Sequence, residues 1–145
     1  MNSTALPFII SIHPQYVRAI LSGQKTVECR KSSIGLAPGA QLYLYATHPV
    51  RAILGKARVS VLYEGTPAEM WNAHRDQACV TEADFFSYYR TAKKATLIAL
   101  ADVMTFPNPI PLATLREFQP KFPPPQTARR LTSAFSDIPT LAGIA

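Results

Sequence analysis

The stretch Ser22-Gly23-Gln24-Lys25-Thr26-Val27-Glu28-Cys29-Arg30 places three charged side chains directly after a predicted helix. Gly23 is a natural left-handed terminator for that helix, and the β-favouring residues after Lys25 predict a short strand. Because side chains alternate along a strand, Glu28 and Arg30 are expected on one face and apolar side chains on the other. The sequence therefore predicts a strand with one ionic face.

Two interpretations of this ionic face stay open. In the first, Glu28 and Arg30 form a solvated pair of charges, which stabilises a fold by little. In the second, the strand borders a cleft in which Glu28 orients Lys25 or Arg30 and a cation meets an anionic ligand. The rest of the chain has to decide between them.

Short apolar runs and turn residues predict the neighbouring elements. Residues 7–13 are expected to form a first strand, and residues 14–23 a helix that begins with Pro14 at its first position. In residues 41–45, Leu42 and Leu44 alternate with Tyr43 and Tyr45, which is typical of a strand covered on both faces.

Residues 56–63 form the clearest half-buried strand pattern. Ala57, Val59, Val61 and Tyr63 are expected to face the core, and Lys56 and Arg58 are expected to form a basic stripe on the outer face.

The second half begins with two helix-start signals and ends in a proline-rich segment. Thr66 and Thr81 are predicted helix caps, and the two helices are expected to cover one end of a barrel. Residues 95–105 predict a closing strand. Seven of the chain's 13 prolines lie in residues 107–125, so that segment is expected to be extended, with at most a short helix at 112–118.

Composition limits the classes of protein. A chain of 145 residues with 48% hydrophobic and 17% charged residues fits one globular domain. A net charge of +6 and a pI near 9.6 favour an anionic partner. Two cysteines without clustered histidines predict no metal site. The chain shows neither a signal peptide nor an apolar run of roughly 18 residues, so we expect a cytoplasmic protein that does not bind membranes.

The charged stretch also carries a family resemblance. Residues 23–30 resemble the Gly-x-Lys-x-x-Glu-x-Arg signature of the ASCH family, a branch of the PUA-like β-barrels, and the blocks at 11–14, 36–39 and 53–55 are similar as well. The resemblance implies an α+β fold: a small barrel of about five to six strands with flanking helices. It implies one domain over residues 1–145, with the proline-rich segment 106–145 wrapped on it.

Members of this family are associated with RNA binding, modified-base reading and hydrolysis. One activity removes the acetyl group of acetylcytidine with a Lys, Thr and Glu set. Lys25 matches the lysine, Glu28 stands at the threonine position, and the acidic position falls near Ala78, with Asp76 as a neighbour. A carboxylate beside Lys25 keeps the lysine protonated, and a protonated lysine binds anions better than it abstracts protons. The sequence therefore favours a binding protein over an amidohydrolase.

The expected function is therefore binding of RNA or a nucleotide, with a base and phosphate in a cleft beside the first helix. The alternatives are a small hydrolase of a modified nucleoside and a ribonuclease, in either of which Lys25 and Glu28 would be catalytic. No cofactor is expected, the protein is predicted to be a monomer, and a protein partner for the proline-rich segment stays possible. The predicted ligand-binding residues are Lys25, Glu28, Arg30, His13, Tyr45, His48, Arg51, Lys56 and Arg58.

Overall fold

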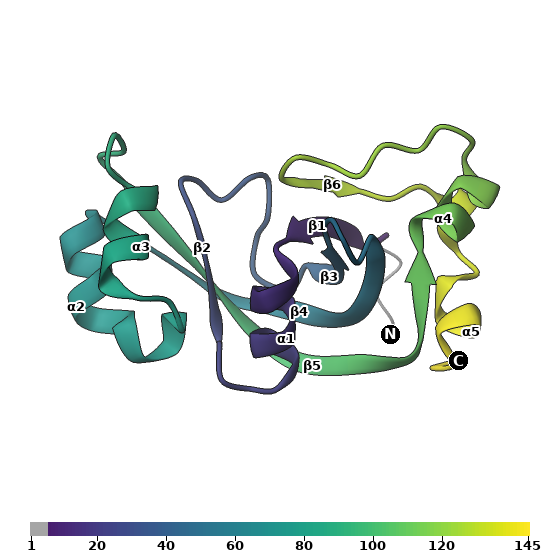
Figure 1. The fold of residues 1–145 in the computed structure, drawn as a ribbon, viewed down its shortest axis with the longest axis horizontal. Coiled ribbons are helices and arrows are strands. Elements are labelled where there is room, and N and C mark those ends of the chain that lie inside the picture. The colour runs from purple at the N-terminus through teal and green to yellow at the C-terminus, as the bar shows by residue number, and fades with distance from the viewer. Residues whose placement is uncertain (1–5) are drawn as a thin grey trace.

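A curled six-stranded sheet organises residues 6–145, the part of the chain that the computed structural model describes (Figure 1). The strand order is β2-β5-β4-β3-β1-β6, and β1 and β3 are the parallel neighbours. The strands are β1 (Phe8–Ile12), β2 (Val27–Arg30), β3 (Gln41–Ala46), β4 (Ala52–Gly65), β5 (Ala95–Pro111) and β6 (Ala128–Arg130). The predicted α+β class with five to six strands is confirmed over the described residues.

The helices lie around the ends of this sheet. They are α1 (Pro14–Leu21), α2 (Pro67–Ala78), α3 (Glu82–Tyr88), α4 (Leu112–Phe118) and α5 (Ile138–Ala142), with a 3-10 turn, η1 (Ser133–Phe135). Helices α2 and α3 stand beside β2 at one end, whereas α4 and α5 lie at the other (Figure 1). Helix α1 covers the middle of the sheet, between the two groups.

Local sequence signals account for the helix boundaries. Gly23 has φ +88° just after α1, the left-handed conformation expected of a terminating glycine. Thr66 and Glu69 form a reciprocal capping box at the start of α2, and the Thr81 side chain accepts a hydrogen bond from the Asp84 amide at the start of α3. All three boundaries agree with the sequence predictions.

The prediction that Val61 faces the core is wrong. Val59 and Ala57 are buried, but Val61 is 40% exposed. The pairing of β4 with β5 shifts register between Val59 and Val61, since Val59 lies opposite Leu100 and Val61 opposite Ala99. Such a bulge inserts one extra residue and inverts the inward and outward alternation beyond it.

Helix α1 packs closely on the sheet because β4 carries a glycine beneath it. A Cβ atom at Gly55 would meet the Met104 carbonyl oxygen of β5 and would lie 2.7 Å from Leu21 Cδ2. Val17 and Ile20 of α1 are fully buried in the core formed with β1, β3 and β4. This contact fixes the position of α1 over the strands.

The proline-rich segment is joined to the rest of the fold. Strand β6 pairs antiparallel with β1, with Arg130 opposite Phe8, and the Ser11 amide donates to the Thr127 carbonyl. A second core contains side chains from both parts of the chain, among them Ile9, Tyr43, Tyr45, Phe106, Phe122, Leu131 and Phe135.

None of the helices formed by residues 6–145 is long and apolar enough to cross a membrane. The N-terminal stretch in which the sequence predicts no signal peptide includes residues 1–5, which lie outside the described part.

Candidate functional site

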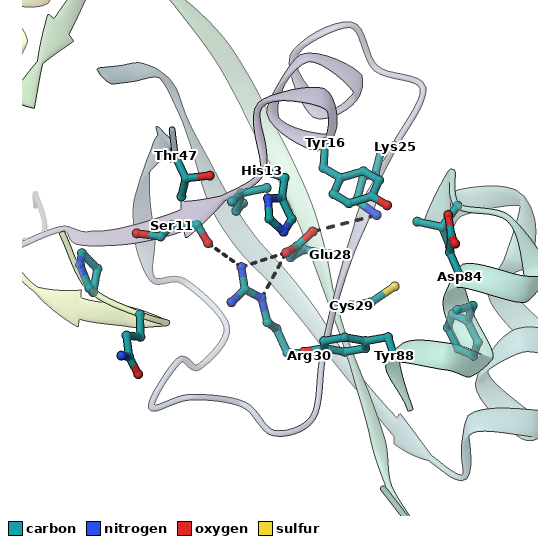
Figure 2. Close-up of a pocket in the computed structure, with 15 residues that line it drawn as sticks. Ser11, His13, Tyr16, Lys25, Glu28, Cys29, Arg30, Thr47, Asp84 and Tyr88 are labelled. Carbon is teal, nitrogen blue, oxygen red and sulfur yellow. Dashed lines mark hydrogen bonds and ion pairs between the residues drawn. The ribbon is translucent and has the colours of Figure 1, made fainter. Parts of the chain in front are cut away.

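A cavity of about 490 Å³ opens between α1, the facing ends of β1 and β2, and α3 (Figure 2). Residues 125–126, just before β6, complete its rim. We call it the α1 cavity. The residues that border it include Ser11 and His13 at the end of β1, Tyr16, Lys25 before β2, Glu28, Cys29 and Arg30 of β2, Thr47, and Asp84 and Tyr88 of α3.

The floor of the α1 cavity is a hydrogen-bonded pair of opposite charges. Arg30 Nε and Nη2 lie 3.0 Å and 2.9 Å from Glu28 Oε2, and Arg30 Nη2 also donates to the Ser11 carbonyl at 2.8 Å. Glu28 is only 6% exposed. Glu28 and Arg30 therefore belong to a mostly buried pair rather than to a solvated strand face, and the carboxylate is held in one orientation.

Lys25 lies on the other side of the same carboxylate. Its side chain is buried, its ammonium donates to the Ala78 carbonyl at the end of α2, and the ammonium lies 3.9 Å from Glu28 Oε1. It also lies 5.0 Å from the centre of the Tyr16 ring, within the range of a cation–π interaction. Figure 2 shows Lys25 and Arg30 flanking Glu28.

The charges on this floor do not balance. Among the described residues there, two cations, Lys25 and Arg30, share the carboxylate of Glu28. Asp84 adds a carboxylate, but it is exposed at the rim. Buried charges without full compensation are costly, so the floor favours a ligand that brings negative charge or hydrogen-bond acceptors.

Aromatic side chains form the walls. Tyr16 of α1 and Tyr88 of α3 lie on either side of the opening above Glu28 and Cys29 (Figure 2). Tyr88 is 41% exposed, and Lys31 Nζ lies 5.0 Å from its ring centre. Burial raises the pKa of Tyr88 above its ordinary value, so the phenol stays neutral near pH 7. Two aromatic side chains thus border the cavity.

Cys29 borders the cavity but is a poor nucleophile. Burial raises the pKa of its thiol from 9.0 to about 11, although the charges of Lys25 and Arg30 act in the opposite direction. Thiol reactivity depends on the thiolate, of which little is present near neutral pH. The geometry gives no support to catalysis by this cysteine.

Hydroxyl and amide groups gather where β1 meets the rim. Ser11 is 8% exposed, and its Oγ is the buried side-chain polar atom that has no hydrogen-bond partner among residues 6–145. Thr47, His13 and Gln126 border the cavity beside it.

The structure brings together four of the nine predicted ligand-binding residues: His13, Lys25, Glu28 and Arg30. The other five lie outside the α1 cavity. Tyr45 is 2% exposed inside the second core. His48 and Arg51 contact each other at 3.3 Å on the surface, Arg58 pairs with Asp102 at 2.8 Å, and Lys56 lies on the β4 surface. Their ligand-binding roles stay predictions.

Sequence reasoning did not select several residues that border the cavity. Asp84 borders the cavity, whereas Asp76, the neighbour of the family's acidic position, does not, and Ser11, Tyr16, Thr47 and Gln126 also contribute. A signal existed for Tyr16 and Asp84, because each lies in a helix whose start the sequence marks, with Pro14 for α1 and Thr81 for α3. Ser11 is marked only by the family block at 11–14, and Thr47 and Gln126 carry no such signal, since the three residues come from segments that are distant in the sequence. Residues 6–145 hold no group of three or more His, Cys, Asp or Glu side chains able to bind a metal.

A curled mixed sheet with helices at its end and a cavity beside α1 defines a PUA-like domain, and comparisons agree. Residues 6–117 match a family model described as a domain of unknown function, DUF365. A Zymomonas mobilis protein called an ASCH domain-containing ribonuclease is 34% identical over 119 residues, covering 82% of this chain and 80% of the relative.

Solved structures point to the same family. The crystal structure of ASCH from Zymomonas mobilis has a TM-score of 0.88 at 31% identity, and the match covers 93% of this chain and 94% of that one. A crystal structure of a mutant form of the Zymomonas mobilis protein gives a TM-score of 0.85 at 30% identity, over 90% and 94% of the two chains. The chain belongs to the ASCH domain family, as its charged stretch predicts.

Proposed function

We propose that this protein binds RNA, and that the α1 cavity receives one unpaired base with a phosphate close to Lys25 or Arg30. The observation that supports this most is the buried floor in which Glu28 is flanked by two cations. It combines a fixed hydrogen-bond acceptor with donors and excess positive charge. A net charge of +6 adds long-range attraction for a polyanion.

The chemistry of the floor suits the edge of a nucleobase. Glu28 Oε1 accepts no hydrogen bond among the described residues and faces Lys25 at 3.9 Å, so it can accept an N–H from a base. Lys25 and Arg30 can donate to ring nitrogens or carbonyl oxygens. Every base has neighbouring donors and acceptors on its edge, so these charges support base binding without selecting one base.

The walls suit the faces of the same base. A ring inserted between Tyr16 and Tyr88 would point its edge at Glu28 (Figure 2). Stacking on an aromatic side chain contributes about 1–3 kcal/mol per base in single-strand recognition. Single-stranded RNA is therefore the proposed form, because a base inside a duplex cannot enter.

The test is fluorescence anisotropy with a labelled single-stranded RNA of mixed sequence, for wild type, Glu28→Gln and Glu117→Gln. Both substitutions remove one negative charge, but Glu117 is an exposed residue of α4 outside the cavity. We expect Glu28→Gln to weaken binding by about 10- to 100-fold, as for loss of a hydrogen bond to a charged group, and Glu117→Gln to leave it unchanged. Equal affinity of the three proteins, or no binding by wild type at low salt, would overturn the proposal.

RNA cleavage is the second candidate, and two observations favour it: the name of the Zymomonas mobilis relative and the position of His13 at the rim of the charged cavity. When the neighbouring 2′-oxygen cleaves RNA, a general base removes the 2′-hydroxyl proton and the oxygen attacks phosphorus. The bond from phosphorus to the 5′-oxygen breaks, and a general acid gives that oxygen a proton. The imidazole of His13 is the type of side chain that serves as a general acid or base, and Arg30 can stabilise the phosphate charge. Labelled RNA that stays intact with fresh wild-type protein would exclude this candidate while leaving binding in place.

The remaining expectations follow from the same picture. Cys29 and Cys79 are both free thiols, which supports the expected cytoplasmic location. A monomer is the proposed state, with RNA as the partner and residues 1–145 as one domain.

A further inference from the structure

We propose that Ser11 recognises the ribose 2′-hydroxyl of the nucleotide in the α1 cavity, so that the protein selects RNA over DNA. This inference rests on the proposed function and adds to it the sugar specificity of the same site.

The starting observation is the unsatisfied hydroxyl of Ser11. Its residue is more than nine-tenths buried, and Oγ has no hydrogen-bond partner among residues 6–145. Leaving a buried polar group unpaired costs about 1–3 kcal/mol. Such a group at the edge of a cavity is explained if a ligand supplies the missing partner.

The backbone around Ser11 is already fixed, so its hydroxyl is held in place. The Ser11 amide donates to the Thr127 carbonyl at 3.0 Å, and the Ser11 carbonyl accepts from Arg30 Nη2 at 2.8 Å. Ser11 also lies in the parallel pairing of β1 with β3, opposite Tyr45. These contacts occupy the main-chain groups and leave the side-chain hydroxyl as the polar group of Ser11 that has no partner among the described residues.

The neighbours of Ser11 indicate which part of a nucleotide it would meet. The base edge is matched by Glu28 and Lys25, which lie on the α3 side of the cavity, and a phosphate is matched by cations. Thr47 and Gln126, which carry a hydroxyl and an amide, border the cavity as Ser11 does, and Arg30 bonds the Ser11 carbonyl rather than its hydroxyl. A hydroxyl both donates and accepts, as does the ribose 2′-hydroxyl. The sugar is thus the part of the ligand that fits this end of the cavity.

The experiment compares two oligonucleotides of the same length and base sequence, one with ribose and one with deoxyribose and uracil in both. Anisotropy gives the dissociation constants for wild type, Ser11→Ala and Ser60→Ala. Ser60 is the control because it is a half-buried serine of β4 whose Oγ already donates to the Ala99 carbonyl. A melting curve for each variant reports whether the fold is kept.

We expect wild type and Ser60→Ala to bind the ribose strand about three- to tenfold more tightly than the deoxyribose strand, as for one neutral hydrogen bond. Ser11→Ala should lose this preference by weakening ribose binding alone. Equal binding of both strands by wild type, or an equal loss for both strands in Ser11→Ala, would overturn the inference while leaving the proposed function in place. Absence of RNA binding by wild type would overturn both.

Discussion

The ammonium of Lys25 and the carbonyl of Ala78, 53 positions apart in the sequence, are joined by a buried hydrogen bond. Ala78 is the last residue of α2, where unpaired carbonyls and the helix dipole favour a cation. Lys25 therefore ties the start of β2 to the end of α2 and faces the α1 cavity as well. A lysine in the family signature has a structural role here besides any role in binding.

Replacing Lys25 by methionine tests that structural role. The substitution keeps the volume but leaves the Ala78 carbonyl unpaired and removes one of the two cations beside Glu28. We expect the free energy of unfolding to fall by about 1–3 kcal/mol, measured by urea denaturation. Lys56→Met, on the half-exposed face of β4, is the control and should change it by about 0.5 kcal/mol or less. Equal effects of the two substitutions would show that Lys25 contributes no more than a surface lysine.

Alkylation rates should separate the two cysteines. Burial raises the pKa of Cys29 to about 11, whereas Cys79 is exposed just after α2. With iodoacetamide at pH 8, Cys79 should be modified first and Cys29 only slowly, because the thiolate is the reacting form. Peptide mass spectrometry over time measures both. Modification of Cys29 as fast as Cys79 in the folded protein would contradict the buried, protonated thiol.

The raised pKa of Cys29 also predicts a loss of stability in alkali. In the unfolded chain this thiol titrates near 9.0 and in the folded chain near 11, so between these values the folded state holds more protons. The free energy of unfolding must then fall as pH rises from 9 to 11. Tyr43 and Tyr45, whose pKa values burial raises from 10.0, act in the same sense at higher pH.

The measurement is urea unfolding at a series of pH values for wild type and Cys29→Ser, which removes the titrating group. The slope between pH 9 and 11 should be shallower in the variant. Parallel slopes would mean that Cys29 does not contribute to the alkaline loss.

Gly55→Ala should destabilise the protein and disturb the cavity from a distance. The new Cβ would meet the Met104 backbone and Leu21 at the end of α1, and a strand backbone cannot yield as a flexible side chain does. We expect a loss of about 1–3 kcal/mol from overpacking, with weaker RNA binding because α1 carries Tyr16. Ala57→Gly, two residues further along β4, serves as a comparison that removes volume instead. A stable Gly55→Ala protein with unchanged binding would contradict the close packing of α1.

Local patterns predicted most of the elements because their causes are local. The glycine at 23, the threonine caps at 66 and 81 and the helix at 112–118 each depend on a few neighbouring residues. Strand β6 escaped prediction because Ala128-Arg129-Arg130 has no apolar alternation, and it forms by pairing with β1. Val61 was misassigned because a bulge depends on the partner strand.

The residues of the site also fall into two groups, those that a local pattern predicts and those that only the assembled fold places. The position of Lys25, Glu28 and Arg30 at one cavity could be predicted because one short stretch carries all three and the family signature marks them, whereas their ligand-binding roles stay predictions. Tyr45 was expected in the cleft, but its position in β3 places it in the second core. The hydroxyl of Ser11 became a candidate for ligand contact only because it is buried without a hydrogen-bond partner, which is a property of the assembled fold.

The most direct test of base binding in the α1 cavity is a set of two-dimensional amide NMR spectra of the labelled protein, titrated with a short single-stranded RNA. The account predicts that the amide signals of Ser11, Lys25, Glu28 and Tyr88, which border the cavity, shift with a common dissociation constant, while those of Leu115 and Ile138 in the second core stay in place. Shifts confined to the α4 and α5 end of the molecule, with the cavity signals unchanged, would contradict it.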